Sequence, residues 1–191
     1  MATGPIQRFP SAITSDGKTI VFRQGGGSED FNIGMVRLDG EREPEMLLET
    51  SFQEHTPKIS PDDQWLAYVS DETGRDEIYV TRFPTGGKWQ ISTEGGTEPM
   101  WSRDGRELFY RNGEKMIAVS IAAGPELSPG KPTLLFEGPY DMKVGSGATN
   151  YDVAADGRFA MILTEARSAG PTHVTLVLNW FRELERLVPV D

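Results

Sequence analysis

The chain contains 191 residues, of which 37% are hydrophobic and 25% are charged, a composition typical of one globular domain rather than of a disordered segment. Its formal net charge of -10 repels phosphate backbones and anionic lipid headgroups, so we expect neither nucleic acid nor a membrane as a partner. The sequence has no cysteine, which excludes disulfides, thiol catalysis and thiolate metal sites.

Two kinds of targeting segment are also not expected. No stretch approaches the roughly 18 consecutive apolar residues of a membrane-spanning helix. The first 15 residues lack the apolar core of a signal peptide. As written, the chain is therefore expected to be soluble and cytoplasmic. If it is a fragment of an exported parent, the compartment is instead periplasmic or extracellular, and the sequence leaves this alternative open.

Four acidic turns divide the chain into similar units. The stretches are TSDGKTIVF at 14–22, SPDDQWLAY at 60–68, SRDGRELFY at 102–110 and AADGRFAMI at 154–162. Their aligned aspartates Asp16, Asp62, Asp104 and Asp156 are 46, 42 and 52 residues apart by subtraction, which is the length of one propeller blade. Asp and Gly form such turns because Asp caps its own backbone and Gly accepts a positive φ.

The predicted strands follow these turns in chain order. The first repeat, about 8–50, has strands at 9–14, 19–23, 33–38 and 45–50; the second, about 51–93, at 55–60, 65–70, 77–83 and 89–93; the third, about 94–138, at 98–102, 107–112, 116–121 and 133–138; the fourth, about 139–180, at 151–154, 158–164 and 173–180. Strands that are apolar on consecutive positions need cover on both faces, as stacked blades provide. The sequence thus predicts one all-β domain over 1–191 with an incomplete last repeat.

A short amphipathic helix is predicted at about 180–188, after the last strand. Four apolar residues recur there at helical spacing: Trp180, Phe181, Leu184 and Leu187. Asn179 is a suitable N-cap and Pro189 a stop. We expect this apolar face to pack on the last blade, on a second subunit or on another domain.

The repeats resemble a known family. HTPKISPDDQWLAYVSDETGRDEIYVTRF and EPMWSRDGRELFYRNGEKMIAVSI are similar to the SPDG-type propeller repeat of the TolB family, which also occurs in prolyl oligopeptidase-like peptidases. The closing LVLNWFRELERLVP resembles the end of propellers attached to bacterial receptor-like serine/threonine kinases. The resemblance is weaker in the first and fourth repeats, and AADGRF lacks the usual Ser-Pro. It implies a TolB-like β-propeller and, for the peptidase relatives, a hydrolase domain that is not found in this sequence.

The number of repeats leaves three architectures open. Four blades are the lower limit for a propeller, and the resemblance implies a six-bladed ring. The chain can close as a four-bladed ring, form the last part of a larger propeller, or pair with a second copy. Because an open blade edge exposes unpaired backbone groups, we predict a homodimer that covers such edges.

A ligand site is expected where the innermost strands begin, because these ends converge on the central channel of a propeller. Counting back six to eight residues from each turn aspartate selects positions near the channel, and Tyr151 and Asp152 follow the last of them closely. The groups expected to bind a ligand or to transfer protons are Arg8, Glu54, His55, Thr56, Thr97, Glu98, Asn150 and Tyr151. No cofactor is predicted, and a metal held by Glu54, Glu98 and Asn150, as in lactonase-like propellers, is the weaker interpretation.

Two functions are compatible with this pattern. The first is a non-catalytic binding or scaffolding module for a protein or peptide, part of a larger sensor or receptor-like protein, because rigid blades with variable loops suit recognition. The second is a small esterase-like or lactonase-like hydrolase that uses His55 as base with Glu54 or Glu98 as its partner. No Gly-x-Ser-x-Gly elbow occurs in the sequence, which weighs against the second.

Overall fold

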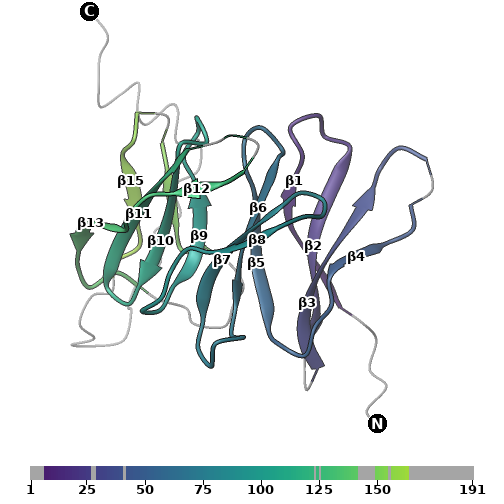
Figure 1. Ribbon diagram of the computed structural model, residues 1–191, viewed down its shortest axis with the longest axis horizontal. Helices are drawn as coiled ribbons and strands as arrows, with labels where there is room; N and C mark the ends of the chain where they lie inside the picture. The colour runs from purple at the N-terminus through teal and green to yellow at the C-terminus, as the bar shows by residue number, and fades with distance from the viewer. Residues whose placement is uncertain are drawn as a thin grey trace, which may run out of the picture.

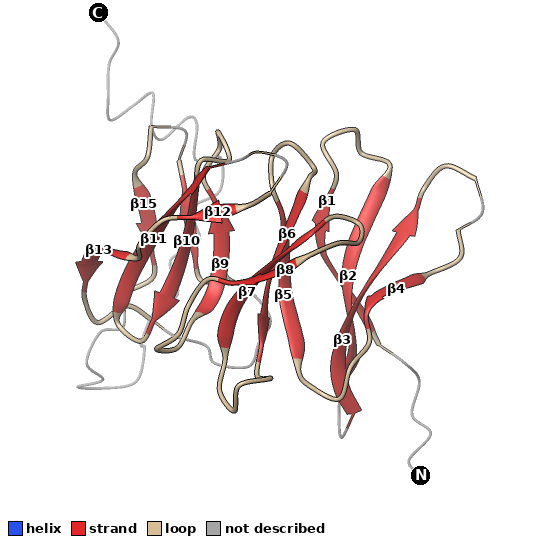
Figure 2. Cartoon of the chain, in the orientation of Figure 1, coloured by secondary structure: helices blue, strands red, loops and turns tan. Residues whose placement is uncertain are grey.

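The computed structural model describes residues 7–26, 29–40, 42–122, 124, 126–141, 149–154 and 156–163. Every regular element in these ranges is a β-strand, as Figure 2 shows. The part of the chain that the model describes contains no helix able to cross a lipid bilayer. The predicted helix at about 180–188, the last predicted strand and the residues Trp180, Phe181, Leu184 and Leu187 lie outside the described ranges.

The first two sheets are four-stranded antiparallel meanders. Their strand orders are β1-β2-β3-β4 and β5-β6-β7-β8. The bounds are β1 Arg8–Ile13, β2 Thr19–Gly26, β3 Glu29–Arg37, β4 Glu45–Leu48, β5 Glu54–Ile59, β6 Trp65–Ser70, β7 Glu77–Arg82 and β8 Lys88–Gln90. Each strand pairs with the next along the chain, as the repeated turns predict.

The third and fourth sheets repeat this meander with differences. In the third, the path β9-β10-β11 continues into β13, and the unpredicted two-residue strand β12 also pairs with β11. In the fourth, the described strands are β14 and β15. The bounds are β9 Thr97–Trp101, β10 Glu107–Asn112, β11 Lys115–Ala122, β12 Ser128–Pro129, β13 Thr133–Glu137, β14 Tyr151–Val153 and β15 Phe159–Met161.

The sheets follow one another in chain order, from β1–β4 at one end to β15 at the other (Figure 1). Strand β5 packs against β1, β2 and β3, and β9 packs against β5, β6 and β7. The first strands of the second and third sheets therefore contact the preceding sheet, as in stacked propeller blades. The prediction of an all-β propeller built from four-stranded units is confirmed as a partial propeller.

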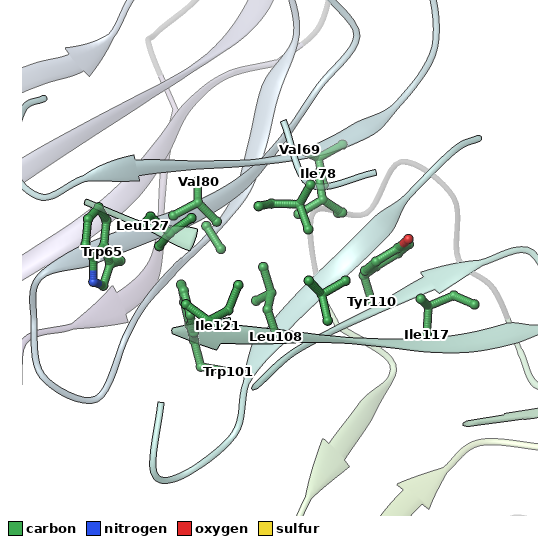
Figure 3. Close-up of a cluster of buried hydrophobic side chains, with 13 residues drawn as sticks. Trp65, Val69, Ile78, Val80, Trp101, Leu108, Tyr110, Ile117, Ile121 and Leu127 are labelled. Atoms are coloured by element: carbon green, nitrogen blue, oxygen red, sulfur yellow. The ribbon is translucent and has the colours of Figure 1, made fainter. Parts of the chain in front are cut away.

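The hydrophobic core is divided between neighbouring sheets. The largest cluster joins the second sheet to the third and contains Trp65, Val80, Trp101 and Leu108, among others (Figure 3). A second cluster joins the first sheet to the second through Val21, Ile33 and Tyr68, among others, and a third cluster joins the third sheet to the fourth around Phe109 and Tyr151, among others. Burial on both strand faces explains why β6 is apolar almost throughout.

The acidic turns share one hydrogen-bonding pattern. In the first three, a Ser or Thr hydroxyl donates to the aspartate two residues later and accepts from the backbone N–H five residues later. The hydroxyl-to-carboxylate distances are 2.7 Å for Thr14 to Asp16, 2.5 Å for Ser60 to Asp62 and 2.7 Å for Ser102 to Asp104. The N–H donors are Thr19, Trp65 and Glu107, at 3.0, 2.9 and 2.9 Å. The side chains thus close each turn, which explains their recurrence in the sequence.

Candidate functional site

Residues on or next to the first strands of the four sheets line one open cavity of about 540 Å³, here called the inner-strand cavity. Strands β1, β5, β9 and β14 all contribute to its wall. The residues that line it are Pro10, Ser11, Thr56, Pro57, Lys58, Met100, Thr149, Tyr151 and Asp152. Its volume lies within the range of about 300–1,000 Å³ that is usual for ligand pockets.

Three of the strands at the cavity change register against their neighbours, as β-bulges do. The pairing of β1 with β2 shifts between Pro10 and Ala12. The pairing of β5 with β6 shifts between His55 and Lys58, and the pairing of β9 with β10 shifts opposite the start of β9. Within these bulges Thr56 and Glu98 have left-handed φ values of 52° and 54°, although a proline follows each of them. Such a backbone is costly for residues other than glycine and re-aims the neighbouring side chains.

Glu98, Asn150 and Tyr151, which the sequence predicts as site residues, are brought together. The Asn150 N–H donates to Glu98 Oε2 at 3.0 Å, and the Tyr151 hydroxyl donates to the Glu98 carbonyl at 2.8 Å. Burial raises the pKa of the Glu98 carboxyl, and the Asn150 N–H and the Arg111 guanidinium partly oppose this increase. Glu98 and Tyr151 are buried, and Tyr151 also lines the inner-strand cavity.

Glu54 does not line the cavity. Its side chain is buried, and its Oε1 accepts a hydrogen bond from the Thr50 hydroxyl in the segment between the first two sheets. Its Oε2 has no hydrogen-bond partner among the described residues. Burial raises the pKa of the Glu54 carboxyl, and the nearby carboxylates of Glu72 and Asp71 add to this increase.

His55 has a different acidic neighbour from the ones that the sequence suggests. Its Nδ1 lies 2.9 Å from the Thr56 hydroxyl oxygen, and its Nε2 lies 3.7 Å from a carboxylate oxygen of Asp76. Asp76 directly precedes β7, and no pattern in the sequence pointed to it. His55 thus contacts Thr56, which lines the cavity, and also lies near Asp76.

The remaining predicted residues lie away from the cavity. Arg8 is exposed and donates from Nε to Gln24 Oε1 at 2.8 Å, on the neighbouring strand of its own sheet. Thr97 begins β9, where it pairs in register with Arg111. Within the described ranges, no three His, Asp or Glu side chains are grouped closely enough to hold a metal ion.

Lys58 is a cavity residue that the sequence prediction missed, whereas the sequence places Asp152 beside the channel as the residue after Tyr151. Lys58 and Asp152 are the charged side chains among the described residues that line the inner-strand cavity. Burial lowers the pKa of the Lys58 ammonium, whereas the carboxylate of Asp152 opposes this decrease. Both lie four residues before a turn aspartate, so a shorter count back along the strand would have found Lys58.

The chain matches no protein-family model and no curated protein sequence. It is similar to solved structures at low identity. A puromycin-hydrolyzing peptidase from Mycobacterium tuberculosis superposes with a TM-score of 0.63 at 16% identity, over 82% of this chain and 28% of the peptidase. A TolB-like protein from Agrobacterium tumefaciens gives 0.59 at 18% identity, over 85% of this chain and 59% of that protein.

A third solved structure is the periplasmic gluconolactonase PpgL of Pseudomonas aeruginosa. It superposes with a TM-score of 0.53 at 19% identity, over 80% of this chain and 49% of the lactonase. The chain thus spans less than two thirds of the length of each of these proteins. At such identities the similarity concerns the fold, and it agrees with the repeats and the sheet order described above. The chain has a TolB-like β-propeller fold, of which the described residues form a part.

Proposed function

We propose that this chain is a non-catalytic binding module that holds a short segment of a protein or peptide in the inner-strand cavity. The observation that carries the proposal is the joint wall that four sheets give to this cavity. The hydroxyls of Ser11, Thr56 and Thr149 can exchange hydrogen bonds with a peptide backbone. Proline and methionine side chains supply apolar contact beside them, the mixture that is usual in binding pockets.

Peptide binding can be tested by blocking the cavity. Fluorescence anisotropy would measure the binding of a set of labelled short peptides to the wild-type chain and to Ser11→Trp, whose indole should fill the cavity. Ser128→Trp, on the exposed strand β12, is the matched control. We expect Ser11→Trp to abolish the binding that Ser128→Trp retains, with both variants melting as the wild type does. The absence of any peptide binding, or equal binding by both variants, would contradict the proposal.

A hydrolase is the second candidate, because one observation favours it. His55 lies between the Thr56 hydroxyl and the Asp76 carboxylate, an order that suits a nucleophile, a base and an orienting acid. Thr56 also lines the cavity. Turnover of p-nitrophenyl esters or simple lactones that disappears in His55→Ala would support this alternative. Under the binding proposal we expect no turnover above the buffer rate.

We further propose that a second copy of the chain is a partner. The support is the exposed apolar surface of β1, the first strand of the described array. Phe9 is 40% exposed and Ile13 is 55% exposed. Exposed large apolar side chains on the first sheet of a repeat array, which has no preceding sheet among the described residues, favour an interface there.

A further inference from the structure

Lys58 and Asp152 occupy equivalent positions in different repeats. Each lies four residues before its turn aspartate, where the first repeat has Ala12 and the third has Met100. The second and fourth repeats therefore place opposite charges at the same structural position. Strand β9 of the third sheet comes between β5 and β14 in chain order, so these charges belong to sheets that are not consecutive.

The two charges share a cavity without neutralising each other directly. Both side chains line the inner-strand cavity and also a second cavity of about 370 Å³ beside the acidic turns. None of the ion pairs between described residues joins Lys58 to Asp152. The Lys58 ammonium has no hydrogen-bond acceptor among the described residues, whereas one oxygen of Asp152 accepts from the Val153 N–H at 2.8 Å.

The environments of the two charges differ. Lys58 is half-buried, whereas Asp152 is exposed. A partly desolvated ammonium whose nearby counter-charge, Asp152, forms no ion pair with it gains more from an added carboxylate than an exposed group gains from an added cation. A purely acidic ligand would be repelled by Asp152 and by the negative net charge of the chain. A purely basic ligand would be repelled by Lys58.

We propose that the inner-strand cavity selects a peptide segment that carries an acidic and a basic side chain next to each other. The carboxylate of the segment lies against Lys58 and its cationic group lies against Asp152. The hydroxyls of Ser11 and Thr149 contact the backbone between them. This inference rests on the proposed binding function and adds to it the chemistry of the segment that is bound.

The test uses four peptides of one length, acetylated and amidated so that their ends carry no charge. They differ only in a central pair, which is Glu-Lys, Glu-Gln, Gln-Lys or Gln-Gln. Fluorescence anisotropy measures their affinity for the full chain. We expect Glu-Lys to bind about tenfold or more tighter than Gln-Gln, since one charge-assisted contact contributes roughly that factor. Glu-Gln should bind more tightly than Gln-Lys, because the Lys58 contact is the less solvated one.

Variants assign each charge to its partner. Lys58→Met should reduce the affinity for Glu-Lys to that for Gln-Lys and leave Gln-Gln unchanged. Asp152→Asn should reduce the affinity for Glu-Lys to the affinity that the wild-type chain has for Glu-Gln. Lys18→Met, at an exposed lysine beside a turn, is the matched control and should change none of the affinities.

Each contrary result has its own meaning. Equal binding of all four peptides would overturn the charge selection and leave peptide binding intact. A Lys58→Met variant that weakens all four peptides to the same extent would overturn the assigned contact, because such an effect is structural. No binding of any peptide would contradict the proposed function itself.

Discussion

Glu54 is the most deeply buried carboxylate among the groups that the sequence predicts to line the channel. The residue is 2% exposed, and one of its carboxylate oxygens has no hydrogen-bond partner among the described residues. The free energy of unfolding should therefore depend on the protonation of this group. Because burial raises the pKa of Glu54, the folded chain keeps this proton to a higher pH than the unfolded chain does.

Glu54→Gln tests the linkage between this carboxyl and stability. The stability that the raised pKa supplies is fully present below the unfolded pKa and is lost as the pH rises through the folded one. A glutamine does not titrate and suffers no such loss. The melting temperature of Glu54→Gln minus that of the wild type should therefore increase from about pH 4 to about pH 8. Differential scanning fluorimetry across this range measures it, with exposed Glu45→Gln as control. A difference that shrinks as the pH rises would contradict the linkage.

The position of each side chain along its inner strand was harder to predict than the strand itself. A count back from Asp62 selects Glu54 and His55, but a bulge at Thr56 shifts the register of β5. Since alternate residues of a strand face opposite sides, a bulge changes which residues face the channel. The count also ended before Lys58, whereas Thr56, which it selected, and Tyr151, which follows its last position, do line the cavity.

At the scale of the element, the acidic turns were the most predictable part of the fold. Their hydrogen bonds join residues at most five positions apart, so the sequence pattern contains nearly all the information. The second turn is informative because Asp63 replaces the glycine of the others and keeps a left-handed φ of 57°. The Asp63 carboxylate accepts from the Ser15 N–H at 3.0 Å, and this contact links the first turn to the second.

Substitution of the turn hydroxyl should have opposite effects in two repeats. Ser60→Ala removes the buried acceptor of the Trp65 N–H and should cost roughly 1–3 kcal/mol of the free energy of unfolding. Ala154→Ser restores the hydroxyl that the fourth turn lacks, and we expect it to stabilise the chain by up to about 1 kcal/mol. Urea denaturation measures both. Equal stability of Ser60→Ala and wild type would show that the side-chain bond contributes nothing.

At the scale of the whole molecule, the sequence predicted the order of the sheets but not how the array ends. Sheet order follows from apolar runs that repeat at regular intervals, whereas the cover of β1 depends on contacts that no local pattern specifies. The exposed Phe9 and Ile13 at this end are the support for a second copy as a partner.

The dimer makes a prediction about mass. Size-exclusion chromatography with light scattering should give twice the molecular mass of one chain at high concentration. On dilution the measured mass should fall toward that of a single chain. Ile13→Asp places a charge on the proposed interface and should give one mass at all concentrations. Leu134→Asp, on the exposed strand β13, is the control and should remain dimeric. A wild-type chain with one mass at every concentration would contradict the dimer.

The division of the core among pairs of neighbouring sheets has a consequence for how such a chain changes in length. Each hydrophobic cluster joins only two neighbouring sheets, so the chain has no single central core that would be lost when one sheet is removed or added. Growth or loss by whole blades then changes the curvature and the ends of the array while the internal contacts persist. A chain that spans 59% of a TolB-like protein can keep a well-buried interior for this reason.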